Sequence, residues 1–409
     1  MRILMLAPSV PYPPNKGTAT RNYNILKNLA LRHDVGLLTF GDEAELAGAE
    51  ALRQYCYQVD VIPRPTRSGA RRVWSLASTP VPDLVLRLWS AEFVSRLASL
   101  LRQHRFDFVQ IEALEMSHLW KKATDLLEPN VHRTPRVVLD AHNAEHVLQR
   151  RAWQIDSRKP GKWHGALYSF IQWQKLRRYE ARCCARVDGV AVVSEADRRA
   201  LGAVAGPLRT TVVPNGVDVD HFRAVSRSDS SAPPTMVFAG TMDFRPNVDA
   251  VVWFCEQILP RVRRRVQDAR LLIVGPAPNG EVRRLASRPG VEVVGFVDDV
   301  RPVVGQAHAY VVPLRFGGGT RFKVLEAMAM GVPVVSTSLG CEGILVTPGE
   351  DVLVADAPDD FAEKTIRLLT DASLRKGLAQ RSRHVAERLY DWHRIVPVLE
   401  EFYRQLEST

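Results

Sequence analysis

The chain has 409 residues, of which 46% are apolar and 24% are charged, and its formal net charge at pH 7 is +10. This length exceeds what one ordinary hydrophobic core serves and predicts two α/β domains, while the average charged fraction excludes wholesale disorder. No run approaches the ~18 uninterrupted apolar residues that a membrane-spanning helix needs. The five cysteines are scattered without metal-ligand spacing, so we expect a reducing, cytoplasmic compartment.

The first half of the chain alternates apolar runs of strand length with amphipathic stretches of helix length, which is typical of parallel βαβ construction. The opening run, Met1–Val10, favours a buried strand over a signal peptide because Pro8 interrupts it. The expected strands are Ile3–Ala7, Asp34–Thr39, Phe108–Ile111, Val137–Asp140 and Gly189–Val193, with a last strand and turn in Thr211–Asp218. The expected helices include Thr20–Leu31 and Ala91–Arg102.

A Ser/Asp/Pro-rich stretch, residues 226–234, indicates an exposed linker. The strands expected beyond it are Thr235–Ala239, Arg270–Val274, Val291–Gly295, Ala309–Pro313, Pro333–Ser336 and Val352–Val354. The pattern is then helical to Thr409. We therefore expect domains at residues 1–225 and 235–388, and a C-terminal helix, 389–409, that crosses back to the first domain. Doubly wound sheets bind ligands at the carboxyl ends of their strands, so two of them would share a cleft.

The most informative segment is Pro313–Ser336, which runs from the end of one expected strand through the next. Gly317–Gly319 opens the chain before a helix of good helix formers, about Arg321–Met330. Backbone N–H groups at such a helix start can approach an anion, which the helix dipole also favours. Arg321 and Lys323 place two cations in the first turn, where the dipole disfavours them unless an anion is bound. The segment therefore predicts an anion site.

Glu326 follows in the same helix and is placed to accept hydrogen bonds from vicinal hydroxyls, such as those of a ribose. With this carboxylate, Pro313–Ser336 resembles the donor-binding motif of the GT-B-fold glycosyltransferases of family 4. The resemblance extends over nearly the whole chain. Pro11–Leu31 resembles the family's first acceptor-side loop. Residues 212–222, 238–247 and 295–300 resemble the turn before the interdomain linker, the first strand and loop of the donor domain, and the loop that cradles the nucleotide base.

The resemblance implies the GT-B fold: two Rossmann-like, doubly wound parallel-sheet domains that face each other across a cleft. It implies transfer of a sugar from a nucleotide-diphosphate sugar to a glycan, lipid-linked or other hydroxyl acceptor, in the synthesis of cell-surface polysaccharide or glycoconjugate. The donor-binding residues that it implies are Gly240, Thr241, Arg245, Asn247, Phe296, Val297, Gly318, Gly319, Thr320, Arg321, Lys323, Val324 and Glu326. The acceptor-side residues are Gly17, Thr18, Glu112 and His142, and the catalytic residues are His142, Arg321 and Lys323.

Two departures from the family pattern affect the expected chemistry. The family usually has two glutamates separated by seven residues; Glu326 matches the second, but Gly318 occupies the first position. The donor-domain loop carries Thr241 and Asn247 where the family usually has Arg and Lys. Arg321 and Lys323, helped by Arg245, are therefore expected to meet the diphosphate charge. Without a carboxylate nucleophile, the family resemblance favours a front-face displacement with retention.

No metal and no other cofactor is expected. Asp218-Val-Asp220 has the Asp-x-Asp form of metal-dependent glycosyltransferases of another fold, but it lies in the turn before the linker and favours a turn role. Arg321 and Lys323 can stabilise the departing diphosphate without a metal. His33, between a helix and a strand, is expected to be structural. Glu145 and His146 are weaker site candidates than His142.

Ten lysines and arginines, against two acidic residues, lie between Arg150 and Arg186 and are interleaved with aromatic residues, among them Trp163, Tyr168, Phe170 and Trp173. This segment predicts peripheral contact with an anionic membrane. Further apolar anchoring is expected from Arg71–Phe93, through Trp74, Leu84, Leu86, Leu88 and Trp89. No nucleic-acid module accompanies the charge, so nucleic acid is not expected as a partner.

Three alternatives stay open. A nucleotide-sugar 2-epimerase can share the same fold. An oxidoreductase is disfavoured because no Gly-x-Gly-x-x-Gly motif follows the first strand. A non-enzymatic basic binding protein would account for the charge but not for Gly317–Glu326.

Overall fold

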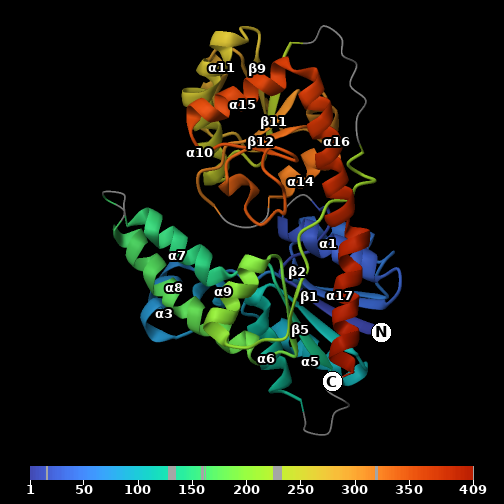
Figure 1. The fold of residues 1–409 in the computed structure, drawn as a ribbon. Coiled ribbons are helices and arrows are strands. Elements are labelled where there is room, and N and C mark those ends of the chain that lie inside the picture. The colour runs from blue at the N-terminus through green and yellow to red at the C-terminus, as the bar shows by residue number, and fades with distance from the viewer. Residues whose placement is uncertain are drawn as a thin grey trace. The chain divides into compact units, whose positions relative to one another are not determined.

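The computed structural model describes residues 1–14, 17–127, 135–157, 161, 163–223, 233–317 and 321–408. Three of the expected donor-binding residues, Gly318, Gly319 and Thr320, lie outside the described residues, as does most of the expected linker. The chain divides into two compact units, one formed by Met1–Pro214 with Ile395–Thr409 and the other by Asn215–Arg394 (Figure 1).

The first unit is built on a parallel sheet with the strand order β3-β2-β1-β4-β5-β6-β7. The strands are β1 (Arg2–Ala7), β2 (Asp34–Gly41), β3 (Gln58–Pro63), β4 (Phe108–Glu112), β5 (Arg136–Ala141), β6 (Gly189–Val192) and β7 (Thr210–Val212). In the centre of the sheet, Leu4 of β1 pairs with Gly36 of β2 and with Val109 of β4. The central strands are almost wholly buried, because parallel sheets are covered by helices on both faces.

Three helices of the first unit begin at a serine that caps them. Ser68, Ser90 and Ser194 each accept a hydrogen bond from a backbone N–H of the first turn and so cap α3, α5 and α9. The helices are α1 (Gly17–Leu29), α2 (Leu46–Leu52), α3 (Gly69–Ser78), α4 (Asp83–Leu86), α5 (Ala91–Gln103), α6 (Ser117–Thr124), α7 (Glu145–Asp156), α8 (Trp163–Cys184) and α9 (Glu195–Ala205). Helices α7 and α8 pack against each other, and α3 lies beside α8 (Figure 1).

The end of α17 (Trp392–Glu407) completes the first unit. The ring of Tyr403 stacks on that of Phe108 with the centroids 4.6 Å apart, and Arg32 donates to the carboxylate of Glu400 at 2.8 Å. His33 has the structural place expected of it, because Nε2 lies 3.2 Å from the same carboxylate. Within α17, Tyr403 therefore packs in the core of the first unit, and Glu400 binds residues at its surface.

The second unit has the strand order β10-β9-β8-β11-β12-β13. The strands are β8 (Thr235–Ala239), β9 (Arg270–Val274), β10 (Val291–Gly295), β11 (Ala309–Val312), β12 (Val334–Ser336) and β13 (Leu353–Val354). The helices are α10 (Arg245–Trp253), α11 (Leu259–Arg265), α12 (Gly280–Arg284), α13 (Arg301–Gly305), α14 (Phe322–Ala329), α15 (Pro358–Thr370) and α16 (Ala372–Leu389). Its core is one cluster of buried apolar side chains on both faces of the sheet.

The division between the units precedes the boundary expected after residue 225. Val217 donates a backbone hydrogen bond to the Tyr390 carbonyl at 2.7 Å, and its side chain is buried in the second core. The turn that follows therefore belongs to the second unit. In this turn the Asp218 carboxylate accepts the backbone N–H groups of Asp220 and His221, as the turn role of Asp218-Val-Asp220 requires.

Each sheet reverses its strand order once, between β1 and β4 in the first unit and between β8 and β11 in the second. Ligands of such sheets bind beyond the carboxyl ends of the strands that flank the reversal. The loops after β1, β4, β8 and β11 are therefore where a site belongs. No helix among the described residues combines the length and the apolar character needed to cross a bilayer.

Candidate active site

The donor side of the site lies in the second unit, where the chain leaves β8 through Gly240. A Cβ atom at Gly240 would lie 2.7 Å from the Lys323 ammonium and 2.8 Å from the Asn247 amide nitrogen, so the position requires glycine. Gly275 stands behind this loop at a φ of +140°, and a Cβ there would meet the Gly240 carbonyl at 1.9 Å. Two glycines thus let the loop after β8 and the start of α14 approach each other.

Lys323 projects from the first turn of α14 into this contact. Its Nζ donates to Asn247 Oδ1 at 3.0 Å and lies 4.2 Å from the centroid of the Phe238 ring. Burial and the nearby guanidinium of Arg321 lower the pKa of Lys323 to about 7, although Glu326 opposes the shift. Because burial and a neighbouring cation disfavour the charged form of Lys323, an anion bound beside its ammonium group would stabilise that form. This is the property expected of a diphosphate contact.

Glu326 lies one turn further along α14. Burial raises the pKa of its carboxyl group to about 7. No side chain among the described residues donates a hydrogen bond to this carboxylate, which leaves its oxygens available to ligand hydroxyl groups. Val324 differs from its neighbours, because its side chain is fully buried in the core and its N–H donates to the Arg321 carbonyl. The side chain of Val324 therefore anchors α14 in the core and does not face a ligand.

The remaining predicted donor residues that the structure describes lie in the loops after β8 and β10 and at the start of α10. The Thr241 carbonyl accepts a hydrogen bond from the Asn247 amide at 2.9 Å, which fixes the loop after β8. The guanidinium of Arg245 lies over the Phe316 ring at 5.3 Å. Phe296 and Val297 follow β10, at the edge of the sheet, and the Phe296 side chain is 68% exposed.

The acceptor side lies in the first unit and is built on buried charges. Arg21 of α1 binds both carboxylate oxygens of Asp140, at the end of β5, with two distances of 2.7 Å. His142 Nε2 lies 3.1 Å from Glu112 Oε2, at the end of β4, and 3.5 Å from Asp140 Oδ2. Glu112 and Asp140 have no exposed surface. The structure therefore brings together the predicted residues Glu112 and His142.

Three polar side chains complete this network. With its amide turned so that Nδ2 faces the carboxylate, Asn22 donates to Glu112 Oε2 at 2.9 Å and to the Thr18 carbonyl at 3.2 Å. Gln110 donates to the other oxygen of Glu112 and accepts a hydrogen bond from the Tyr403 hydroxyl. The network therefore connects the first turn of α1, at Thr18, with the ends of β4 and β5 and with α17.

Within the network, the pKa values of Glu112 and His142 are raised and that of Asp140 is lowered. Burial and the charge of Asp140 raise the pKa of Glu112 to about 7. Burial also disfavours the Asp140 carboxylate, but Arg21 overcomes this and holds its pKa below the usual range. Burial opposes protonation of His142, yet its hydrogen bonds to Asp140 and Glu112 raise its pKa to about 9. His142 is therefore a cation at neutral pH, and Glu112 is the group poised to exchange a proton.

Glu112, Asp140 and His142 each offer a ligand atom, and the three atoms lie within 4.8 Å of one another. The donor set does not fit a metal ion, because both oxygens of Asp140 already bind the Arg21 guanidinium. A divalent cation there would meet the positive charge of Arg21 at close range.

Sequence reasoning missed several members of the acceptor side. Arg21, Asn22 and Asp140 were parts of expected elements and were given no role. The available signal was a charged residue at the end of an apolar strand, Val137–Asp140. The weaker candidates, Glu145 and His146, lie at the start of α7, where the carboxylate of Glu180 accepts their N–H groups and contacts His146 Nδ1 at 2.6 Å, so it caps α7. Burial and the charge of Glu180 raise the pKa of Glu145 to about 7, and the charge of His142 opposes this shift.

Gly17 and Thr18, also predicted for the acceptor side, line a cavity of about 730 Å³ in the first unit. The cavity lies beyond the end of β1, beside the point where the strand order reverses. A volume of this size holds a sugar with a further group attached.

Comparison with known proteins agrees with this architecture. Residues 15–221 match the family model described as glycosyltransferase family 4, and residues 233–371 match that of glycosyl transferases group 1. A protein with two doubly wound parallel sheets and these domains is a glycosyltransferase of the GT-B fold. This chain belongs to glycosyltransferase family 4.

Relatives and solved structures lead to the same class. An uncharacterized 44.6 kDa protein in the cps region of Klebsiella pneumoniae is 22% identical over 405 residues, which cover 95% of this chain and 96% of that protein. The phosphatidyl-myo-inositol mannosyltransferase of Mycobacterium tuberculosis is 30% identical over 240 residues, which cover 55% of this chain and 61% of the mannosyltransferase.

Two solved structures share the fold over their full length. The sucrose-phosphate synthase of Thermosynechococcus elongatus superposes with a TM-score of 0.71 at 16% identity, and 100% of each chain is covered. The HepE protein of Anabaena, in complex with UDP, superposes with a TM-score of 0.68 at 17% identity and the same coverage of 100%. The expected GT-B fold class and the glycosyltransferase class are therefore confirmed.

Proposed function

We propose that this enzyme transfers a hexose from a nucleotide-diphosphate sugar to a hydroxyl group of a glycan or lipid-linked acceptor, with retention and without a metal ion. The observation that carries the donor half is the contact of Lys323 with the Gly240 loop, at the point where the second sheet reverses its strand order. A relative that is a phosphatidyl-myo-inositol mannosyltransferase, and a structural neighbour that binds UDP, support this choice of substrates.

On the donor side, the task is to stabilise the charge that develops on the leaving diphosphate. Lys323 and Arg321 stand at the start of α14 and supply two cations, to which the helix dipole adds its own field. Glu326, one turn away, accepts hydrogen bonds from the ribose hydroxyls. These groups are held in place before the reaction, so little reorganisation opposes bond cleavage.

On the acceptor side, His142 is proposed to orient the sugar. With a pKa of about 9 it carries a proton at neutral pH, so it donates hydrogen bonds to substrate oxygens and does not act as the base. The acceptor's proton then passes to an oxygen of the departing diphosphate, which becomes more basic as the bond to the sugar breaks. This path agrees with a front-face displacement, in which the acceptor enters on the face that the diphosphate leaves.

The nucleotide is identified by a thermal-shift panel of UDP, GDP, ADP and their sugars. A ligand that binds only the folded state raises the melting temperature by mass action. We expect one nucleoside diphosphate to stabilise the enzyme, and its hexose derivative to yield a new glycosidic bond with an acceptor. A stabilising donor that is only hydrolysed or epimerised, with no transfer to any hydroxyl acceptor, would favour the 2-epimerase alternative.

Turnover is expected to continue in the presence of excess chelator. The reason is that Lys323 and Arg321 are proposed to neutralise the diphosphate charge, while the Asp218 carboxylate is engaged with backbone N–H groups of its turn. Initial rates with the donor found in the panel, measured with and without EDTA, test this. Loss of activity that manganese or magnesium restores would contradict it.

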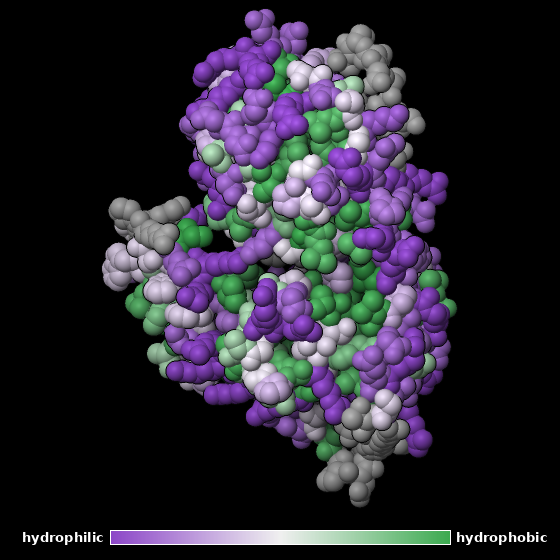
Figure 2. Space-filling view, viewed as in Figure 1, coloured by the Kyte–Doolittle hydropathy of each residue, from purple (hydrophilic) through white to green (hydrophobic). Residues whose placement is uncertain are grey.

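We also propose that the first unit contacts anionic membrane through α3 and α8. The two helices are linked by a hydrogen bond from Lys175 to the Ser75 carbonyl at 2.9 Å. Trp74 of α3 is 74% exposed and Trp163 of α8 is 63% exposed. Figure 2 shows apolar and polar residues interspersed on this side of the first unit. Exposed tryptophans among basic residues are typical of surfaces that lie in a lipid interface.

The aromatic residues of α8 do not all serve this contact. The rings of Trp153 and Trp173 stack with centroids 5.4 Å apart, and Arg150 lies over the Trp173 ring at 5.6 Å. Tyr168 donates a hydrogen bond to Asp83. Trp173 therefore joins α8 to α7, and Tyr168 joins α8 to α4. Of these aromatic residues, Trp163 is the one that we propose to contact lipid.

Sedimentation with liposomes tests the membrane contact. The enzyme is expected to bind phosphatidylglycerol vesicles and not phosphatidylcholine vesicles, and to be released by high salt, because charge attraction is screened within ~8 Å at physiological ionic strength. Trp74→Ala with Trp163→Ala should reduce binding about tenfold or more, as expected when ~1.4 kcal/mol or more of apolar contact is lost. Leu345→Ala, in the second unit and also at a residue 74% exposed, is the control. Equal binding by all variants would contradict this surface.

A further inference from the structure

The cavity beside Gly17 and Thr18 is lined by an unusual set of charges. Four arginines reach it: Arg64, Arg67, Arg72 and Arg87. The acidic residues that line it are Glu45 and Glu115; burial raises the pKa of Glu115, and the charges of Arg87 and Arg64 oppose this shift. The walls of the cavity are therefore positively charged.

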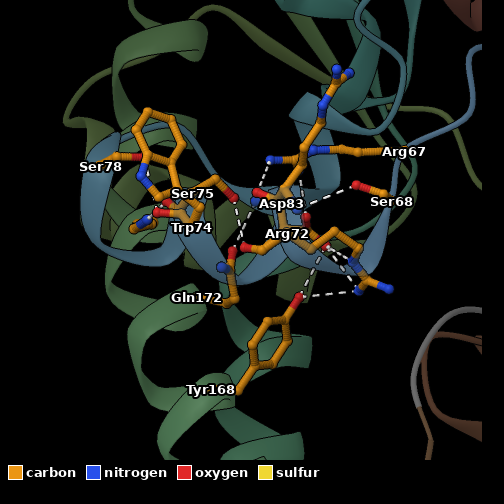
Figure 3. A network of polar contacts seen from close by, with 11 residues as sticks. Arg67, Ser68, Arg72, Trp74, Ser75, Ser78, Asp83, Tyr168 and Gln172 are labelled. Carbon is orange, nitrogen blue, oxygen red and sulfur yellow. Dashed lines mark hydrogen bonds and ion pairs between the residues drawn. The ribbon is translucent and has the colours of Figure 1, made fainter.

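Two of the arginines are held by one buried carboxylate. Arg67 Nη1 donates to Asp83 Oδ1 at 2.6 Å, and Arg72 Nε donates to Asp83 Oδ2 at 3.1 Å. Asp83 is 3% exposed, and its N–H donates to Gln172 of α8 at 2.9 Å (Figure 3). One carboxylate thus fixes two guanidinium groups and leaves them with a net positive charge.

The other two arginines differ in how they are paired. Arg64 binds Glu45 at 2.9 Å. Arg87 follows α4, is exposed, and forms no ion pair with any residue that the structure describes. Arg64 also lies 3.8 Å from Asp42, and the charge of Arg87 acts on Glu115 without an ion pair.

Arg67 and Arg72, in contrast, share the single charge of Asp83, so these two guanidinium groups keep an excess of positive charge at the cavity. An anion inside the cavity would offset this excess.

We propose that this cavity binds a phosphate ester carried by the acceptor, with Arg87 and Arg64 contacting the phosphate oxygens. The inference rests on the proposed function and deepens it by naming the chemical class of the acceptor. A guanidinium group can form two parallel hydrogen bonds to the oxygens of a phosphate. A phosphate has more oxygens and more negative charge than a carboxylate, so it can bind several guanidinium groups at once.

The position of the cavity agrees with an acceptor role. Thr18 lines it, and the Thr18 carbonyl accepts a hydrogen bond from Asn22, whose amide also contacts Glu112 of the polar network. Arg72 belongs to α3, the helix that carries the exposed Trp74. A phosphate ester in the cavity would therefore lie between the polar network and the proposed lipid contact.

Calorimetry of the full-length enzyme tests this with two probes, glucose 1-phosphate and dihexanoyl phosphatidic acid below its micelle concentration. Glucose is the uncharged reference. We expect at least one phosphate ester to bind, and Arg87→Gln to weaken it about tenfold or more, as loss of a charge-assisted hydrogen bond predicts. Arg64→Gln in addition should weaken it further. The preferred probe shows whether the phosphate belongs to a soluble sugar or to a lipid.

The control is Arg105→Gln, which removes an exposed arginine that precedes β4, at the amino ends of the strands, whereas the cavity lies beyond the carboxyl end of β1. It should leave phosphate binding unchanged. Melting temperatures of all variants verify that they fold. Nucleoside diphosphate binding is measured in parallel and should not change in Arg87→Gln.

Three results would overturn the inference: phosphate esters that bind no better than glucose, equal affinity in the wild type and the double arginine variant, or loss of phosphate ester binding in Lys323→Gln alone. In each case intact nucleotide binding would leave the proposed transferase function standing.

Discussion

Replacing Lys323 with alanine is expected to weaken the binding of the nucleoside diphosphate by ~1.5–3 kcal/mol, the contribution of a hydrogen bond to a charged group. Arg321→Ala should have an effect of similar size, because both cations stand at the start of α14. Glu326→Ala should weaken the nucleoside diphosphate but not inorganic phosphate, which has no ribose. Calorimetry with the nucleotide found in the thermal-shift panel measures these differences.

The control for Lys323 is Lys376→Ala, which removes an exposed lysine from α16 in the same unit. It should leave the affinity unchanged. If Lys323→Ala and Arg321→Ala both bound the nucleotide with wild-type affinity, the assignment of the donor site to the start of α14 would be wrong. The affinity of the wild type should also depend on pH, because the pKa of Lys323 is lowered to about 7 in the free enzyme.

The sign of this dependence follows from linkage. A bound diphosphate favours the charged ammonium and raises the pKa of Lys323, so binding takes up a proton when the pH is above about 7. Affinity should therefore fall as the pH rises from 7 toward 9. Titrations in two buffers with different ionisation enthalpies measure the proton uptake directly, and Lys323→Ala should abolish it.

Arg21→Met is expected to destabilise the first unit by about 3–5 kcal/mol, the range for removing one partner of a buried ion pair. The reason is that Asp140 has no exposed surface and would keep a buried charge without its guanidinium partner. Urea unfolding followed by circular dichroism measures the loss. Arg32→Met is the control, since its side chain is 46% exposed and a surface ion pair contributes at most about 1 kcal/mol.

The pH dependence separates this cause from a simple packing defect. In the wild type, Arg21 holds the pKa of Asp140 below its usual range, so the pair adds stability at neutral pH that is lost in acid. In Arg21→Met, the contributions of Arg21 that lower the pKa of Asp140 are lost, and His142 is left to oppose the effect of burial. The pKa of Asp140 should therefore rise, and the variant should lose less stability than the wild type as the pH falls. Adding Asp140→Asn should restore part of the stability; an equal loss at every pH would indicate packing alone.

The sequence predicts most of the sheets because their strands are short apolar runs bounded by turn residues. Strands β8, β9 and β10 begin and end where the pattern places them. Strand β3, Gln58–Pro63, was not predicted. It alternates polar and apolar residues and lies at the edge of the first sheet, so it lacks the continuous apolar signal of a central strand.

The sequence predicts which loops form the candidate site, but not which of their residues contact each other. Glycines and cations near one another in sequence indicate the start of α14, yet the contact of Lys323 with Gly240 joins segments that are distant in the chain. The pairing of Arg21 with Asp140 is also long-range, and an arginine in an amphipathic helix ordinarily indicates a solvated face. Burial of such a charge depends on the tertiary fold, which local patterns do not contain.

The order in which the chain is made bears on the first unit. Residues 215–394 form the second unit as one continuous stretch, whereas the first unit needs Ile395–Thr409 as well as Met1–Pro214. Phe108 and Gln110 of a central strand are covered by Tyr403. On the ribosome, Phe108 and Gln110 of the first unit can be covered only after α17 has been synthesised, whereas all residues of the second unit are present once Arg394 has been added.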